Sequence, residues 1–261
     1  MSRTDRSEAR LAGRDDPADL PGWLVPIRDG ARTITGEQIS AFLPPPGGDA
    51  RPGAVLMLFG EGPGGPDLLL TERAHDMRSH PGQLSFPGGK LDPEDDGPVD
   101  AALREAQEET GLDPEGVEVL ALLPELWLPP SNFAVTPVLA WWRDESPVAV
   151  VDPREVHTIL RVPLEDLLDP AHRVTVVHPA RSYSSPGFLV GPDHDLVLWG
   201  FTAGLINQLF DFVGLTRPWD RSVRVEVPEH MLAGREVDRI RREVARQIDP
   251  EADAEAPEAD R

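Results

Sequence analysis

The chain has 261 residues, of which 39% are hydrophobic, and a formal net charge of −21 at pH 7. This length allows one large domain or two small ones, and so negative a charge argues against a protein that binds nucleic-acid backbones, which need a basic face. The chain contains no Cys, which excludes disulfides, thiolate catalysis and zinc–cysteine sites.

The two ends of the chain differ in composition from its middle. Residues 1–19 are polar and aperiodic and predict a disordered tail. Residues 20–228 are expected to form one domain, and residues 229–261 a C-terminal helix followed by an acidic tail. No apolar run approaches the roughly 18 residues of a membrane span, and no apolar signal segment follows the early Arg residues. We therefore expect a cytoplasmic protein without membrane or nucleic-acid partners.

The first third of the domain predicts a short helix and then a hairpin. Residues 36–42 favour helix before a Pro- and Gly-rich break. The apolar run 54–59 is typical of a buried strand, and residues 67–71 form a second strand after a turn rich in Gly and Pro. The loop that follows carries Arg73 and Arg78, which suit bidentate contacts to an anionic phosphate substrate.

An acidic helix is predicted from Pro98 to the C-terminal cap at Gly111. On a helix Glu105, Glu108 and Glu109 lie at i, i+3 and i+4 and so share one face. Their mutual repulsion, and their place near the helix C-terminus, cost stability. Clustered carboxylates suit oxygen-preferring cations such as Mg²⁺, so this face indicates a metal site.

The segment from Gly89 to Leu112 resembles the Nudix box. That pattern is Gly, five residues, Glu, seven residues, then Arg-Glu-hydrophobic-x-Glu-Glu-x-Gly-hydrophobic, and its second half matches Arg104 to Leu112 in register. The gap from Gly89 to Arg104 is one residue longer than the general pattern, and Asp95 stands where the first Glu is expected.

A second motif precedes the box. Leu69-Leu70-Thr71-Glu72-Arg73-Ala74, then Arg78, Gly82 and Phe86-Pro87-Gly88-Gly89, resembles the coenzyme A pyrophosphatase branch of the Nudix superfamily. The resemblance implies hydrolysis of coenzyme A or its thioesters to 3′,5′-ADP and 4′-phosphopantetheine, with Mg²⁺ or Mn²⁺ as the cofactor. It leaves open a Nudix diphosphatase acting on ADP-ribose or a dinucleotide, and a non-catalytic Nudix ligand sensor.

Site residues follow from the same resemblance. Metal ligation is expected from Glu105, Glu108 and Glu109. The expectation is strongest for Glu105 and Glu109. Arg104 completes the catalytic set by orienting Glu108. Substrate contacts are expected from five residues that neutralise charge or let the backbone approach the metal: Arg73, Arg78, Lys90, Gly88 and Gly89. Which glutamate acts as the base is left open, and Glu155 is a further candidate.

The remaining elements complete an α/β protein. Residues 117–123 and 134–142 predict strands, and Pro137 suggests that the second is an edge strand or carries a bulge. Trp141 and Trp142 are interpreted as packing residues. Further elements are expected in order: a strand and short helix over 155–168, a hairpin over 174–189, a packing helix from about 200 to 213 and a helix over 234–247. The resemblance implies an α/β/α sandwich with a mixed sheet that acts on a small-molecule substrate, with a homodimer left open.

Overall fold

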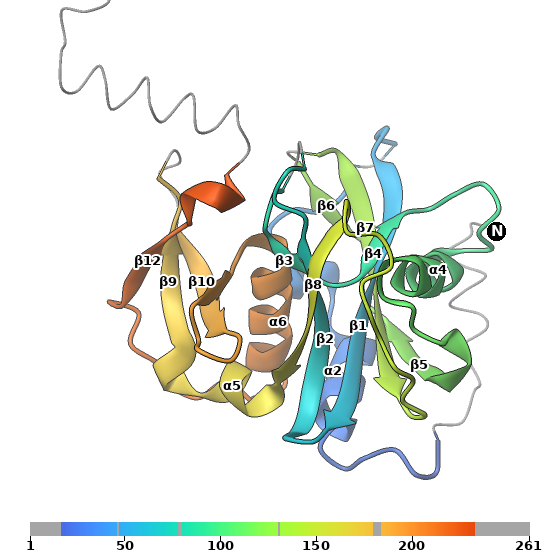
Figure 1. The fold of residues 1–261 in the computed structure, drawn as a ribbon, viewed down its shortest axis with the longest axis horizontal. Coiled ribbons are helices and arrows are strands. Elements are labelled where there is room, and N and C mark those ends of the chain that lie inside the picture. Colours follow the sequence, from blue (N-terminus) through green and yellow to red (C-terminus); the bar gives the residue numbers. More distant parts are fainter. Residues whose placement is uncertain (1–16, 46, 78–79, 130, 180–183, 233–261) are drawn as a thin grey trace, which may run out of the picture.

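The computed structural model describes residues 17–232 apart from 46, 78–79, 130 and 180–183 (Figure 1). Four expectations therefore lie outside the described residues: the tail over 1–16, the position of Arg78, the helix over 234–247 and the acidic tail that follows it. Among the described residues, none of the helices has the length and apolar character that crossing a bilayer requires.

Eight strands form the larger sheet, and their bounds are β1 (Arg51–Gly62), β2 (Gly65–Arg73), β3 (Leu84–Ser85), β4 (Gly88–Lys90), β5 (Val117–Leu122), β6 (Leu126–Leu128), β7 (Phe133–Trp142) and β8 (Val156–Pro163). The order is β3-β2-β1-β7-β5, while β4 pairs with β1, β6 with β7 and β8 with β2. The pairing of β1 with β7 is parallel and the other pairings are antiparallel, so the sheet is mixed as expected.

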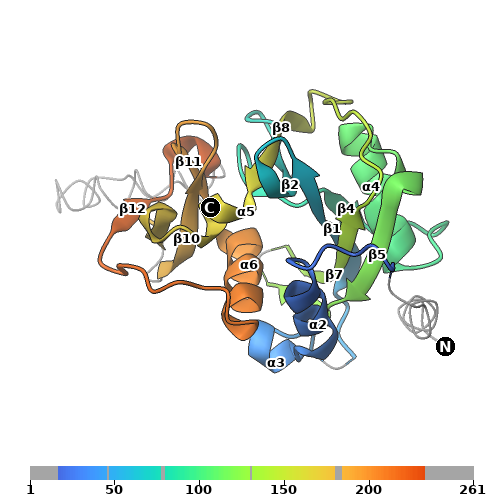
Figure 2. The same cartoon turned by 90° about the horizontal axis from the view of Figure 1, so that it is seen from below.

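Helices cover both faces of this sheet (Figures 1 and 2). The helical elements are α2 (Val25–Thr33), α3 (Gly36–Ile39), α4 (Pro98–Thr110), η1 (Pro114–Gly116), α5 (Leu164–Leu168), η2 (Pro170–His172), α6 (Gly200–Phe212) and η3 (Glu229–Met231). Alternate residues of β1 reach opposite faces: Leu56 and Leu58 pack with α4, whereas Met57 and Phe59 pack with α2 and α6. The predicted α/β/α sandwich is confirmed.

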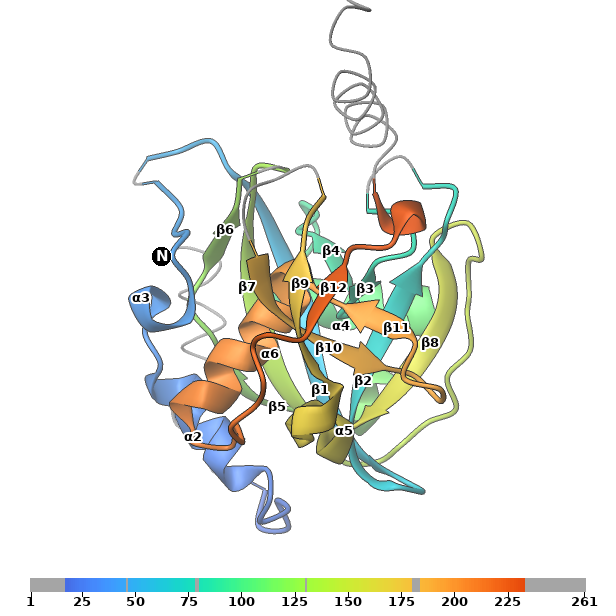
Figure 3. The same cartoon turned by 90° about the vertical axis from the view of Figure 1, so that its left-hand side faces the viewer.

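A smaller sheet lies beside the sandwich in Figure 1 and faces the viewer in Figure 3. Its strands are β9 (Arg173–Val177), β10 (Ser184–Val190), β11 (Leu196–Leu198) and β12 (Arg224–Glu226), in the order β11-β10-β9-β12. The predicted hairpin over 174–189 is β9 and β10. Met231 and Leu232 are buried against Val174, so the packed body continues beyond residue 228. At the other end it begins before residue 20, since Asp19 pairs with Arg143 at 2.8 Å.

The prediction that Pro137 marks an edge strand is wrong. Its strand, β7, is central, with β1 on one side and β5 on the other. Pro137 is tolerated because it lies between two pairings on the same side of β7. The pairing with β5 ends at Val138, and the pairing with β6 begins at Val135. The irregularity in the ladder is in β5, between Val119 and Ala121, not in β7. Trp141 and Trp142 are buried, in agreement with a packing role.

Candidate active site

The acidic helix forms over the residues for which Pro98 and Gly111 predicted it. Helix α4 follows Gly97 as its N-cap and ends before Gly111, whose φ of 69° is the left-handed conformation that favours glycine at a C-cap. Ala102 and Ala106 are fully buried against the sheet, and Leu103 packs beside them. Burial of this apolar face turns the glutamates toward the loop that carries Gly88 and Gly89.

Glu109 is the most buried of the three glutamates, with 7% of its surface exposed. One of its carboxylate oxygens accepts a hydrogen bond from the Gly88 N–H at 3.2 Å. Burial raises the pKa of Glu109 to about 7, although the Gly88 N–H and the charge of Arg73 oppose the shift. The carboxylates of Glu105 and Glu155 raise this pKa further. The site therefore holds negative charge that its own cations only partly compensate.

The Gly88–Gly89 pair packs directly against this charge. Gly88 has a φ of 152°, and a Cβ there would collide with the backbone of β1 at Ala54 and Val55. A Cβ on Gly89 would lie 2.6 Å from the carboxyl carbon of Glu105. Both positions thus require the absence of a side chain.

Arg104 is the centre of a carboxylate clamp. Its Nε and Nη2 donate to the two oxygens of Asp95, each at 3.0 Å, and its Nη1 donates to Glu105 and Glu108, each at 3.1 Å. Asp95 is buried, and its position is fixed in turn by the Asp92 N–H at 2.7 Å. Arg104 thus contacts Glu108 as predicted, but Asp95 receives the bidentate contact.

Sequence reasoning did not give Asp95 this role, although the signal was available. Asp95 occupies the box position at which a Glu is expected, and it is the shorter acid in a loop that is one residue longer. The contact lets a buried acid anchor the guanidinium that holds Glu105 and Glu108. Burial raises the pKa of Glu105, and Arg104 opposes that shift.

The predicted substrate-binding cations differ in their surroundings. Arg73 ends β2, and its Nε is buried without a hydrogen-bond partner among the described residues. That donor is close enough to Glu109 for its charge to lower the glutamate's pKa. Lys90 instead points outward and pairs with Asp92 at 2.9 Å. Of the two, Arg73 is better placed to meet an anion beside the glutamates.

The donor set at the box fits a hard divalent cation. It consists of carboxylate oxygens, and burial raises the pKa of both Glu105 and Glu109, a cost that a bound cation would offset. The carboxylates are held by protein donors, Arg104 for Glu105 and the Gly88 N–H for Glu109. In the described part of the chain, groups of three ligand atoms within 4.8 Å of one another occur at two other places and not among the box glutamates.

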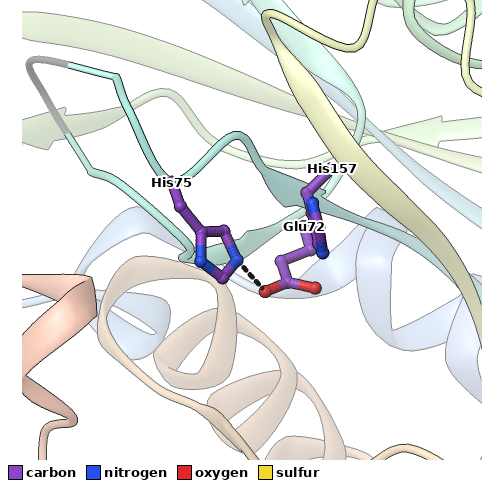
Figure 4. Close-up of side chains that lie close together, drawn as sticks. All are labelled: Glu72, His75 and His157. Atoms are coloured by element: carbon purple, nitrogen blue, oxygen red, sulfur yellow. Dashed lines mark hydrogen bonds and ion pairs between the residues drawn. The ribbon is translucent and has the colours of Figure 1, made fainter.

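One of these compact groups adjoins the box and was not predicted. It contains Glu72 on β2, His75 in the following loop and His157 on β8 (Figure 4). Glu72 is buried, and His75 Nε2 lies 2.7 Å from its carboxylate, the hydrogen bond drawn in Figure 4. The ring of His230 stacks on His75 with centroids 5.3 Å apart. The group is therefore a hydrogen-bonded pair with further imidazoles around it.

Comparison with known proteins identifies relatives of the chain. The family model described as NUDIX domain matches residues 49–180. The uncharacterized Nudix hydrolase NudL of Enterobacter sp. (strain 638) is 37% identical over 162 residues, which cover 58% of this chain and 77% of that protein. NudL of Cronobacter sakazakii (strain ATCC BAA-894) is 38% identical over 148 residues, covering 55% and 73%. Among solved structures, the Nudix hydrolase RenU of M. smegmatis aligns at a TM-score of 0.45 and 22% identity, covering 66% of this chain and 91% of that one.

Proposed function

Because the chain belongs to the Nudix hydrolase family, we propose that it hydrolyses the pyrophosphate bond of coenzyme A or its thioesters. The products are 3′,5′-ADP and 4′-phosphopantetheine or its acyl derivative. The observation that carries the proposal is the meeting of the two sequence motifs. Arg73 and Gly88 belong to the motif that resembles the coenzyme A branch, and both act on Glu109 of the box. The charge of Arg73 lowers the pKa of Glu109, and the Gly88 N–H donates a hydrogen bond to its carboxylate.

Divalent metal binding is assigned to the box glutamates. Glu105, Glu108 and Glu109 would hold Mg²⁺ or Mn²⁺. The assignment rests on their carboxylate oxygens, and on burial that raises the pKa of Glu105 and Glu109 despite the cations nearby. Such an ion would neutralise charge on the phosphates and would lower the pKa of a water that it binds.

The chain's own residues position the substrate and the carboxylates. The clamp from Asp95 through Arg104 holds Glu105 and Glu108 in fixed orientations, which limits the reorganisation needed during the reaction. The Nε of Arg73 is buried and has no hydrogen-bond partner among the described residues, and a phosphate oxygen at the site would supply an acceptor for this guanidinium. Gly88 and Gly89 let β4 pack closely on its neighbours, since a Cβ on Gly88 would meet the backbone of β1 and one on Gly89 would meet the carboxylate of Glu105.

Product analysis tests this proposal. Purified protein is incubated with coenzyme A, ADP-ribose and NADH, each with Mg²⁺, with Mn²⁺ and with a chelator, and the Glu109→Gln variant is run alongside. We expect metal-dependent 3′,5′-ADP from coenzyme A well ahead of the other two products, and a loss of orders of magnitude in the variant.

The other outcomes distinguish the alternatives. Faster cleavage of ADP-ribose or NADH would keep the chemistry and reject the substrate. Absence of turnover with all three, together with ligand binding that persists without a metal, would favour the non-catalytic sensor. The charged clamp around Arg104 argues against a sensor, because a protein that only binds has no need of three carboxylates on one helix face.

A further inference from the structure

A second compact group of ligand side chains lies beside the smaller sheet, outside the Nudix box. It consists of Asp166 on α5, His172 at the end of η2 and His194 in the turn between β10 and β11. The helical elements α5 and η2 contact each other, and both contact β10. The three side chains are partly buried, with exposed fractions of 24%, 20% and 33% in that order.

The two imidazoles present unused nitrogen atoms to one carboxylate. His194 Nε2 lies 3.3 Å from Asp166 Oδ2, and His172 Nδ1 lies 3.9 Å from Asp166 Oδ1. Neither nitrogen has a hydrogen-bond partner among the described residues, although both atoms are buried. Buried polar atoms are seldom left unpaired, because each one loses its hydration without gaining a hydrogen bond.

We propose that Asp166, His172 and His194 form a binding site for a divalent transition-metal ion of the zinc class. Two imidazole nitrogens and one carboxylate oxygen form a mixed set that suits zinc, whereas Mg²⁺ prefers oxygen ligands alone. With metal–ligand bonds of about 2.0–2.1 Å, ligand atoms on a tetrahedral edge lie about 3.3 Å apart. The distance from His194 to Asp166 equals that spacing. The two nitrogens would thus gain the partner that the described part of the chain does not provide.

The group at Glu72, His75 and His157 shows why the same reasoning does not apply there. His75 lies 2.7 Å from Glu72, a hydrogen-bond distance that is shorter than a tetrahedral edge (Figure 4). His75 is thus already partnered, and His157 is exposed. This group provides a matched control, since it also contains two His and one carboxylate.

The backbone brings the three residues together, and the two imidazole rings stack. Asp169 fixes the turn between Asp166 and His172 by accepting from the Ala171 N–H at 2.8 Å. His194 has a φ of 53°, in the left-handed region that non-glycine residues seldom occupy. The rings of His172 and His194 stack with centroids 3.7 Å apart and planes inclined by 20°. Because the lone pair of a ring nitrogen lies in the plane of its ring, one of the two rings has to rotate before both nitrogens can bind one ion.

Zinc uptake by the full-length, untagged chain tests the proposal. The protein is stripped with a chelator, returned to buffer with excess Mg²⁺ to occupy the box carboxylates, and dialysed against Zn²⁺. Elemental analysis then gives zinc per chain, and thermal melting is measured with and without Zn²⁺. We expect one zinc ion per chain and a rise in melting temperature on adding zinc.

Variants locate the ion. His172→Ala and the isosteric Asp166→Asn are expected to weaken zinc binding by at least about tenfold, the lower limit for loss of a partner that supports a metal ligand, and to lose the zinc-induced rise in melting temperature. His157→Ala and Glu109→Gln are expected to keep both. Melting without zinc confirms that each variant is folded, and Asp166→Asn decides if His172→Ala fails to fold. Wild-type protein that takes up no zinc under Mg²⁺, or uptake that His157→Ala removes and Asp166→Asn leaves intact, would overturn the assignment.

Discussion

Replacing Glu109 with Gln tests whether burial of this carboxylate lowers the free energy of unfolding, and whether a bound cation offsets that loss. Burial raises its pKa from 4.5 to about 7. Because the folded protein binds this proton more tightly than the unfolded chain, the metal-free protein loses stability as pH rises from about 4.5 to about 7. At about 1.4 kcal/mol per pKa unit, the full shift corresponds to roughly 3 kcal/mol.

The Gln variant keeps an acceptor for the Gly88 N–H but cannot ionise. In chelator, we expect Glu109→Gln to raise the free energy of unfolding by up to about 3 kcal/mol at about pH 8, and to leave it nearly unchanged at about pH 4, where the wild-type carboxyl is also neutral. Urea denaturation at the two pH values measures the difference. Glu108→Gln is the matched control, because the Glu108 side chain is 59% exposed and its charge is already hydrated.

Added Mg²⁺ is expected to reverse the order of stabilities. The ion stabilises the folded wild-type protein by mass action and does so much less in the variant, which lacks one ligand. A loss of stability of similar size at both pH values would refute this reasoning. The carboxylate would then act through its hydrogen bond to Gly88, as a structural group.

Three further substitutions test the clamp and the sheet. Gly88→Ala forces a Cβ onto a left-handed residue packed against β1 and should lower the free energy of unfolding by about 1–3 kcal/mol; an unchanged urea midpoint would contradict this. Asp95→Asn removes the charged acceptor of Arg104, so metal-dependent hydrolysis should fall about tenfold or more while the circular dichroism spectrum is preserved; full activity would show that the clamp is dispensable. Arg161→Met leaves the buried Asp67 carboxylate without its cation and should cost about 3 kcal/mol in urea denaturation at neutral pH. Burial raises the pKa of Asp67 even with Arg161 present, so this loss should shrink as pH falls, and a loss independent of pH would point to packing instead.

Signals that act over a few residues predicted the box helix closely. Pro98 in the first turn and Gly111 after the last are where α4 begins and ends. The apolar spacing also identified the face that packs on the sheet, through Ala102 and Ala106. These features depend on neighbouring residues along the chain, so the sequence alone contains them.

Features that depend on distant segments were not predictable in the same way. Pro137 suggested an edge because a proline cannot donate to a ladder, but the break between β5 and β6 leaves a place for it inside the sheet. The pairing of Asp166 with His194 joins residues whose proximity only the tertiary structure reveals. The metal assignment for the box glutamates stays a prediction.

The parallel pairing of β1 with β7 has a consequence for how the chain folds. Arg51 lies opposite Phe133, and the box loop and α4 belong to the crossover that connects the two strands. Helix α4 packs on both strands, so its apolar face is fully covered only after that long loop has closed. Closure of a long loop is slow because its entropy must be lost before contacts form. We therefore expect a partly synthesised chain that ends before β7 to leave part of this apolar face exposed, and the packing of α4 to be completed only when β7 pairs with β1.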